Sequence, residues 1–208
     1  MKVLNLYAGI GGNRKLWEDV DVVAVEIDPK IAKVYQDNFP DDEMVVGDAH
    51  HFLLENFGDF DFIWSSPPCP THSDIRRAGV HGGKTDLKAV YPEMQLYAEI
   101  LLLQHFAPLD SKWVVENVRS YYEPLIKPTL IERHYMWSNF PLSEPVIQSR
   151  RIHNDIKGTS TVYGFNIKDT DIENKRAVMR NLINPKLGLH IFNCAFKVRQ
   201  TQLISSKR

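Results

Sequence analysis

The sequence predicts an α/β protein with a Rossmann-like, doubly wound and mostly parallel sheet. Short apolar or β-branched runs alternate with stretches at helical spacing over 2–118, which is typical of parallel strands joined by crossover helices. Several runs end in glycine, acidic residues or proline, at the strand ends where open α/β sheets bind ligands. The 208 residues suffice for one large domain with a sizeable core.

The predicted strands follow from apolar or β-branched runs that stop abruptly. The first, over 2–7, leads into a glycine loop and then a helix-compatible stretch over 13–19. The second, over 21–28, ends in the acids Glu26 and Asp28. Further strands are expected at 44–46, 60–64 and 113–115, with a candidate strand at 161–165.

Helices are predicted where apolar residues recur at helical spacing. One over 29–39 begins with proline after the capping residue Asp28. A second covers 92–106, and a third stretch, 172–196, is interrupted at Asn184-Pro185. The chain is therefore divided into a core over 1–140, a short irregular segment over 141–175, a C-terminal helix returning to the core over 176–196, and a basic, mobile tail over 197–208.

Composition excludes several classes of protein. The formal net charge of -1 provides no global basic field, so a nucleic-acid partner must be held by local patches. Two cysteines, Cys69 and Cys194, indicate neither a disulfide framework nor a zinc site, and no metal is expected. The N-terminus lacks the pattern of a secretory signal, and no apolar run approaches the ~20 residues of a membrane span. These features predict a cytoplasmic protein without a membrane partner.

One cysteine lies in a stiff segment. Cys69 is flanked by Pro67, Pro68 and Pro70, directly after the apolar run 62–64. Prolines fix φ and prevent a helix or a ladder, so the thiol is presented rigidly at a strand end. A thiolate there is a candidate nucleophile for covalent catalysis. The alternative is a buried structural cysteine in a proline turn.

A cofactor site is indicated at the ends of the first three strands. Gly9, Gly11 and Gly12 allow a backbone to approach a ligand, and Glu26 stands where an acid binds the ribose hydroxyls of a nucleoside cofactor. Asp48 can accept a hydrogen bond from an adenine amino group. Because the spacing departs from G-x-G-x-x-G, a cofactor without a phosphate chain fits better. The alternatives are a solvated acid for Glu26 and an Asx turn or helix cap for Asp48.

Together these features resemble the cytosine-C5 DNA methyltransferases, S-adenosylmethionine-dependent enzymes with a Rossmann-like catalytic domain. The segments that match the family's motifs, in order and spacing over 4–118, are Tyr7-Ala8-Gly9-Ile10-Gly11-Gly12, Val25-Glu26-Ile27-Asp28, Gly47-Asp48-Ala49, Pro67-Pro68-Cys69-Pro70 and Glu116-Asn117-Val118. The first motif has tyrosine where the family usually has phenylalanine near the adenine. Order and spacing make the combination specific, although each motif alone is not.

The resemblance implies methyl transfer to cytosine C5 through a covalent adduct. Cys69 would add to C6, Glu116 would protonate or hydrogen-bond N3, and Asn117 would order the surrounding loop. The target base would have to be flipped out of the duplex to meet the thiol. A buried ion-pair partner is the alternative role of Glu116.

The later motifs match less closely. Gln148-Ser149-Arg150 fits the first half of Q-x-R-x-R, whose last arginine contacts cytosine O2, but Ile152 takes the place of that arginine. Arg133 precedes an aromatic run that reads as a strand, and it is the preferred catalytic residue for this contact. Residues 180–185 resemble a degraded G-N-x-V-x-P motif, where a helix returns to complete the cofactor pocket. An ordinary amphipathic helix start is the alternative.

The resemblance assigns two sets of binding residues. S-adenosylmethionine is expected to contact Tyr7, Gly9, Gly11, Gly12, Glu26, Ile27, Asp48, Ala49, Pro67 and Asn181. DNA is expected to contact Ser73, Arg76, Arg77, Asn117 and Arg150. The segment 74–91 combines glycine hinges with basic residues, so it is interpreted as a mobile loop that closes over DNA. A solvated charged loop is the alternative.

The target-recognition region is short. Family members place a long region between their late motifs, whereas this chain offers 141–175, which predicts a short or relaxed recognition sequence. Compact enzymes of this kind are expected of phages and other mobile elements, including restriction–modification systems. Three functions stay open: a monomeric methyltransferase acting on double-stranded DNA, the same chemistry on tRNA, and a methyltransferase-like DNA-binding subunit that needs a partner.

Overall fold

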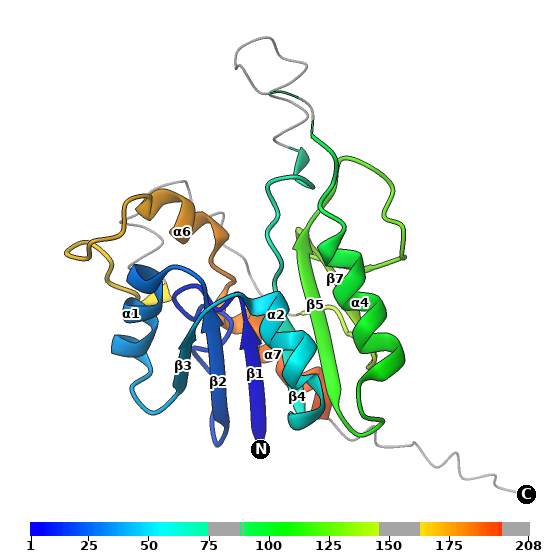
Figure 1. The fold of residues 1–208 in the computed structure, drawn as a ribbon, viewed down its shortest axis with the longest axis horizontal. Coiled ribbons are helices and arrows are strands. Elements are labelled where there is room, and N and C mark those ends of the chain that lie inside the picture. Colours follow the sequence, from blue (N-terminus) through cyan, green and yellow to red (C-terminus); the bar gives the residue numbers. More distant parts are fainter. Residues whose placement is uncertain (75–87, 89, 146–162, 197–208) are drawn as a thin grey trace, which may run out of the picture.

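The computed structural model describes residues 1–74, 88, 90–145 and 163–196. Within them one sheet has the strand order β3-β2-β1-β4-β5-β7-β6 (Figure 1). Its strands are β1 (Lys2–Leu6), β2 (Asp21–Glu26), β3 (Glu43–Val46), β4 (Phe62–Ser65), β5 (Lys112–Val118), β6 (Thr129–Ile131) and β7 (His134–Ser138). The strands β1 to β5 are parallel, whereas β7 runs antiparallel to its neighbours β5 and β6. The predicted mostly parallel, doubly wound sheet is confirmed.

Short helices lie between the strands in the sequence, and two more come after the last strand. They are α1 (Pro29–Asn38), α2 (Ala49–Asn56), the single 3-10 turn η1 (Phe57–Asp59), α4 (Gln95–Phe106), α6 (Lys175–Asn181) and α7 (Pro185–Phe196). Asp28 caps α1 by accepting from the amides of Lys30 and Ile31, as the Asp-Pro pair predicts. The sequence pattern does not predict α2, because its apolar residues are mostly consecutive rather than at helical spacing.

The sheet has a hydrophobic core on each face. On one face α2 and α4 pack, so that Leu53 meets Leu6. On the other face α7 packs, and Ile191 joins Val3 in a second core. A smaller cluster joins α1, α6 and the segment 163–172. Because the helices pack on the faces of the sheet, the ends of its strands are available for a functional site.

Residues 13–19 do not form a helix, contrary to the prediction. They fold into turns, and the buried indole of Trp17 stacks on Phe192 of α7 with ring centroids 5.2 Å apart. Gly188 of α7 lies so close to this segment that a Cβ atom would overlap the backbone of Asn13. The face on which a crossover helix would pack is therefore already occupied by α7.

The later elements agree with the sequence expectations in part. The described part of the candidate strand 161–165 forms no strand, because Gly164 has a φ of +67° and Phe165 is fully buried away from the sheet. The helical stretch 172–196 is present as α6 and α7, with the break where it was predicted. The aromatic run after Arg133 is β7, which confirms its interpretation as a strand.

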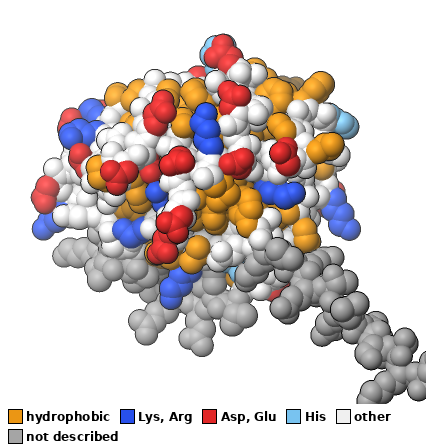
Figure 2. All heavy atoms as spheres, turned by 90° about the horizontal axis from the view of Figure 1, so that it is seen from below, with side chains coloured by type: hydrophobic (Ala, Val, Ile, Leu, Met, Phe, Trp, Pro, Cys, Tyr) orange, Lys and Arg blue, Asp and Glu red, His pale blue; other side chains and the backbone are white. Residues whose placement is uncertain are grey.

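Charges of both signs share the described surface. Figure 2 shows acidic, basic and hydrophobic side chains interspersed on the face seen from below. This mixture agrees with the formal net charge of -1. Across the described ranges, no helix combines the length and the apolar character that crossing a bilayer requires.

Candidate active site

Five strand ends carry the predicted site. Because β1 to β5 are parallel, their carboxyl ends lie at one edge of the sheet, the upper edge in Figure 1. The glycine loop follows β1, Glu26 ends β2, Asp48 follows β3 and Cys69 follows β4. Glu116 lies near the end of β5. Residues from distant parts of the sequence are thus collected at one edge.

Glu26 holds the glycine loop through its carboxylate. Its Oε2 accepts from the amide of Gly9 at 2.9 Å, and its Oε1 accepts from the amide of Asp28 at 3.0 Å. Gly9 has a φ of +55°, in the left-handed region, and a Cβ atom built on it would meet nothing within 4 Å. Glu26 is therefore not a solvated acid, and open space beside Gly9 allows a ligand to lie against the backbone.

The other two glycines pack against the protein itself. A Cβ atom on Gly11, whose φ is +87°, would overlap the ring of Phe39. One on Gly12 would lie 2.5 Å from the carbonyl oxygen of Ile183. Ile183 lies between α6 and α7, so the segment expected to complete the cofactor pocket does contact the glycine loop. Asn181, the last residue of α6, is exposed just before this contact.

The ends of β2 and β3 offer an apolar and an acidic group. Ile27 is 68% exposed directly after β2, and an adenine ring could cover it. Asp48 is exposed and caps α2, because its Oδ1 accepts from the amide of His51 at 3.0 Å. Ala49 is buried behind it. Together with the open space at Gly9, these groups fit the adenosine part of the expected cofactor.

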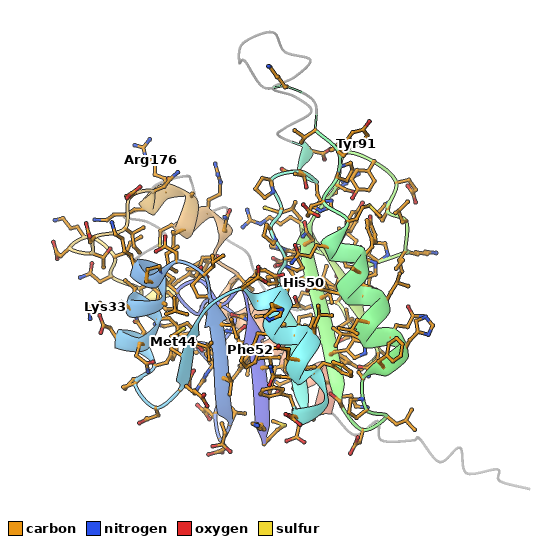
Figure 3. All side chains as sticks on the ribbon, viewed as in Figure 1. Lys33, Met44, His50, Phe52, Tyr91 and Arg176 are labelled. Carbon is orange, nitrogen blue, oxygen red and sulfur yellow. The ribbon has the colours of Figure 1, made fainter. Side chains whose placement is uncertain are left out.

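A buried carboxyl group joins the ends of β1 and β4 to α2. Glu99 of α4 is fully buried. Its Oε1 accepts from the hydroxyl of Tyr7 at 2.6 Å and lies 3.0 Å from Nδ1 of His50, which is labelled in Figure 3. Its Oε2 accepts from the hydroxyl of Ser65 at 2.5 Å. Burial raises the pKa of Glu99, although these hydrogen bonds lower it.

The same contact fixes Tyr7 beside the glycine loop. Burial raises the pKa of Tyr7 well above its usual value, and the charge of Glu99 raises it further. The expected contact of Tyr7 with adenine stays a prediction. Sequence reasoning missed Glu99, although an acid inside the apolar run of a predicted helix was an available signal.

The cysteine loop is anchored at both sides. Nδ2 of the buried Asn117 donates to the carbonyl of Pro67 at 2.9 Å, which links the loop to β5. The carbonyl of Cys69 accepts from the amides of His72 and Ser73 at 3.0 and 3.2 Å. This hydrogen bond ties the cysteine loop to β5, and the expected contact of Asn117 with DNA stays a prediction. The thiol itself is half-buried.

The charges around Cys69 act in opposite directions on its thiol. Burial raises the pKa of Cys69 most, and the charge of Glu116 raises it further. A hydrogen bond from its own backbone amide and the positive charge of Arg180 lower the same pKa. The balance raises the pKa, so the thiolate is disfavoured while Glu116 is charged. Arg180 belongs to α6, which therefore contributes to the environment of the sulfur.

The carboxylate of Glu116 is paired with a histidine. Its Oε1 lies 2.6 Å from Nδ1 of His134, and both side chains are buried. Arg133 is exposed in the turn between β6 and β7, and its Nε donates to Nε2 of His134 at 3.3 Å. The contact of Arg133 with the target base stays a prediction. Sequence reasoning missed His134, although its alternation with Met136 on a predicted strand placed the two on one face.

The expected DNA contacts are described only in part. Ser73 forms an isolated bridge with Ser120, which ties the cysteine loop to the segment after β5. His72, directly before Ser73, is 1% exposed, and its Nδ1 lies 2.6 Å from the hydroxyl of Tyr122. The expected contacts Arg76, Arg77 and Arg150 lie outside the described residues.

Comparisons with known proteins agree with this arrangement. The model of the family described as C-5 cytosine-specific DNA methylase matches residues 1–122, more than half of the chain. No curated protein sequence matches the chain. Among solved structures, a methyltransferase of Entamoeba histolytica is similar over 94% of this chain and 98% of that one, with a TM-score of 0.59 and 11% identity. That likeness extends the shared fold well beyond residue 122.

Two further solved structures are similar over shorter lengths. An S-adenosylmethionine-dependent methyltransferase of Agrobacterium tumefaciens aligns with 59% of this chain and 40% of its own, at 15% identity and a TM-score of 0.40. A mutant DNMT2 of Spodoptera frugiperda aligns with 56% of this chain and 35% of its own, at 25% identity and a TM-score of 0.36.

Proposed function

Because the chain belongs to the C-5 cytosine-specific DNA methylase family, and its cofactor is S-adenosylmethionine, we propose that it methylates C5 of cytosine in double-stranded DNA through a covalent adduct of Cys69. The observation that carries the proposal is the thiol of Cys69, on an anchored loop and within reach of the charge of Glu116. A methyltransferase fold needs neither group. Addition to a pyrimidine ring needs both, because it requires a nucleophile and an acid.

The proposed reaction begins at C6 of cytosine. The sulfur of Cys69 forms a bond to C6 while Glu116 transfers a proton to N3, and the C5–C6 electron pair shifts to the C4–C5 bond. C5 is then nucleophilic enough to accept the methyl group that S-adenosylmethionine supplies when bound. Loss of the C5 proton to water, cleavage of the Cys69–C6 bond and return of the N3 proton to Glu116 restore the aromatic ring and both side chains.

The thiol and the carboxyl group have complementary protonation states in this reaction. Cys69 must lose a proton and Glu116 must hold one. The active pair, a thiolate with a protonated carboxyl group, therefore holds one proton. The resting pair, a thiol with a carboxylate, also holds one. Since the charge of Glu116 raises the pKa of Cys69, a proton on Glu116 favours the thiolate. Moving one proton from sulfur to carboxylate would prepare both groups together.

Double-stranded DNA is the proposed substrate, with recognition by 141–175. A stacked base cannot meet a thiol on a strand-end loop, so the target cytosine is flipped out of the helix. Arg76, Arg77 and Arg150 are proposed to contact phosphates, which position a duplex without reading it. The short segment allows few base contacts and hence a short or relaxed recognition sequence. A monomer acting in the cytoplasm, of the compact kind found in phages, is in keeping with this scheme.

A duplex containing 5-fluorocytosine tests the adduct directly. Fluorine replaces the C5 proton that must leave, so the Cys69–C6 bond persists after methyl transfer. With S-adenosylmethionine present, we expect a protein–DNA complex that survives denaturing electrophoresis. Cys69→Ser should abolish this complex. Cys194→Ser removes the other cysteine, on α7, and should leave the complex intact.

The acceptor distinguishes this proposal from its alternatives. Duplex DNA and tRNA are offered separately with labelled S-adenosylmethionine. Methyl transfer to tRNA alone would assign the same chemistry to RNA, and transfer only after addition of a second protein would indicate a dependent subunit. If neither nucleic acid is methylated or trapped, the proposed function is wrong.

A further inference from the structure

His134 is the hydrogen-bond partner of the Glu116 carboxyl group. The two side chains share one face of the sheet, because Glu116 lies opposite Met136 in the antiparallel pair β5–β7, and His134 is two residues before Met136. Nδ1 of His134 and Oε1 of Glu116 are 2.6 Å apart. Each residue is 6% exposed, so water is poorly placed to replace either partner.

Arg133 determines which nitrogen of His134 carries the proton. A guanidinium N–H can only donate, and Nε of Arg133 donates to Nε2 of His134 at 3.3 Å. Nε2 must therefore accept, and the imidazole proton is on Nδ1. That N–H donates to Oε1 of Glu116. A proton on Nε2 would place two N–H donors against each other.

We propose that His134 positions the proton of Glu116, because its N–H occupies Oε1 and so leaves Oε2 to carry the proton that is delivered to N3 of cytosine. The inference rests on the proposed cytosine C5 chemistry. When the adduct forms, the Oε2–H bond breaks, the N3–H bond forms, and the new carboxylate keeps the N–H of His134, which stabilises its charge. His134 acts through Glu116 and is a positioning residue.

Arg133 and Cys69 are ionisable groups that interact with this pair. Arg133, in the turn between β6 and β7, donates to Nε2 of His134. The cysteine loop contributes Cys69, whose pKa responds to the charge of Glu116. A pH profile of the reaction therefore reflects these groups together with the imidazole, so a comparison of variants is needed.

Three variants of the full chain separate positioning from structure. His134→Leu removes the donor at a similar volume. His134→Asn keeps an N–H in place of Nδ1 but cannot titrate. Tyr135→Phe, on the opposite face of β7, is the matched control. The measurement is the single-turnover rate of methyl transfer to a cytosine-containing duplex as a function of pH, with a melting curve for each variant.

The donor lost in His134→Leu should change both the rate and its pH dependence. We expect the maximal rate to fall about 10- to 100-fold, because a misplaced general acid loses part of its contribution to the rate. The alkaline limb of the pH–rate profile, where the rate falls as the pH rises, should move to higher pH. The reason is that the carboxylate of Glu116 loses a donor that favours its ionised form. His134→Asn and Tyr135→Phe should stay within about threefold of the wild type with the limb unmoved. Structural damage alone would lower the rate without moving the limb.

Each outcome decides between the two proposals. A His134→Leu variant with the rate and limb of the wild type overturns the role of His134 and leaves the proposed function intact. Where His134→Leu does not fold, His134→Asn decides: a wild-type rate supports the positioning role, and a tenfold loss with an unchanged melting temperature overturns it. A wild-type protein that methylates no cytosine overturns the proposed function itself.

Discussion

Glu99 places an ionisable group inside the protein next to the cofactor side of the sheet. Tyr7, His50 and Ser65 contact its two oxygens at 2.6, 3.0 and 2.5 Å. Burial nevertheless raises its pKa. The folded protein therefore keeps this proton at pH values where a glutamate of the unfolded chain has lost it. The ionisation of Glu99 therefore makes the free energy of unfolding depend on pH.

Glu99→Gln should remove this dependence. The stability that Glu99 contributes is fully present below pH of about 4.3, where the unfolded side chain is also protonated. It is lost as the pH rises through the raised value of the folded state. The melting temperature of Glu99→Gln relative to the wild type should therefore increase as the pH rises above about 4, by about 2–4 °C per kcal/mol. Melting curves across this range provide the measurement.

An exposed glutamate supplies the control for this comparison. Glu18 is exposed between the glycine loop and β2, and Glu18→Gln should follow the wild type at every pH. A difference between Glu99→Gln and the wild type that stays constant with pH would show that Glu99 ionises normally in the folded protein.

At the scale of elements, the glycine loop and the α6–α7 connection close on each other. Gly12 faces the carbonyl oxygen of Ile183 and the side chain of Leu182. No side chain fits between them. This contact brings Asn181 and Arg180 towards the carboxyl edge of the sheet, where Arg180 lowers the pKa of Cys69. The position of α6 therefore affects the nucleophile as well as the cofactor side.

Gly12→Ala should weaken this closure. The added Cβ atom would lie 2.5 Å from the backbone oxygen of Ile183, so the connection must move. We expect a loss of about 1–3 kcal/mol of stability and weaker binding of S-adenosylmethionine. Denaturant unfolding and calorimetric binding measure the two effects. Gly58→Ala, where a Cβ atom meets nothing within 4 Å, should change neither, and equal effects of the two substitutions would rule out the steric explanation.

Elements whose cause is local could be predicted from the sequence, and elements that depend on distant partners could not. The Asp28-Pro29 start of α1, the end of β2 at Glu26 and the proline segment after β4 follow from neighbouring residues. The helix expected over 13–19 is absent, because α7 comes from the far end of the chain to take its place. Glu99 and His134 were missed for the same reason, since their partners Tyr7 and Glu116 lie 92 and 18 positions away in the sequence.

At the scale of the whole molecule, the first and last described elements share one core. Trp17 stacks on Phe192 at 5.2 Å with an interplanar angle of 23°. Phe62 of β4 meets both rings edge-on, at 5.9 and 5.2 Å. The indole N–H of Trp17 also donates to the carbonyl oxygen of Gly188, 171 positions later in the sequence. Ring contacts and this hydrogen bond thus join α7 to the apolar face of the sheet. Stability of the sheet therefore depends on α7.

A double-mutant cycle should detect this coupling. We expect Trp17→Leu and Phe192→Leu each to lose about 1–3 kcal/mol of stability. The double variant should lose about 0.5–1.5 kcal/mol less than the sum, because the stacked pair is removed only once. Urea unfolding of the four proteins gives the coupling. Phe106→Leu, at a position 68% exposed on α4, should stay within about 0.5 kcal/mol, and strict additivity of the cycle would disprove energetic coupling between the rings.

The dependence on α7 also has a temporal side. A ribosome makes β1 to β5 long before it makes residues 185–196, and domains generally fold as units during synthesis. Until those residues emerge, Val3, Trp17 and Phe62 lack the helix that covers them in the folded protein. The nascent chain should therefore be prone to aggregation and should depend on a chaperone until α7 has been made.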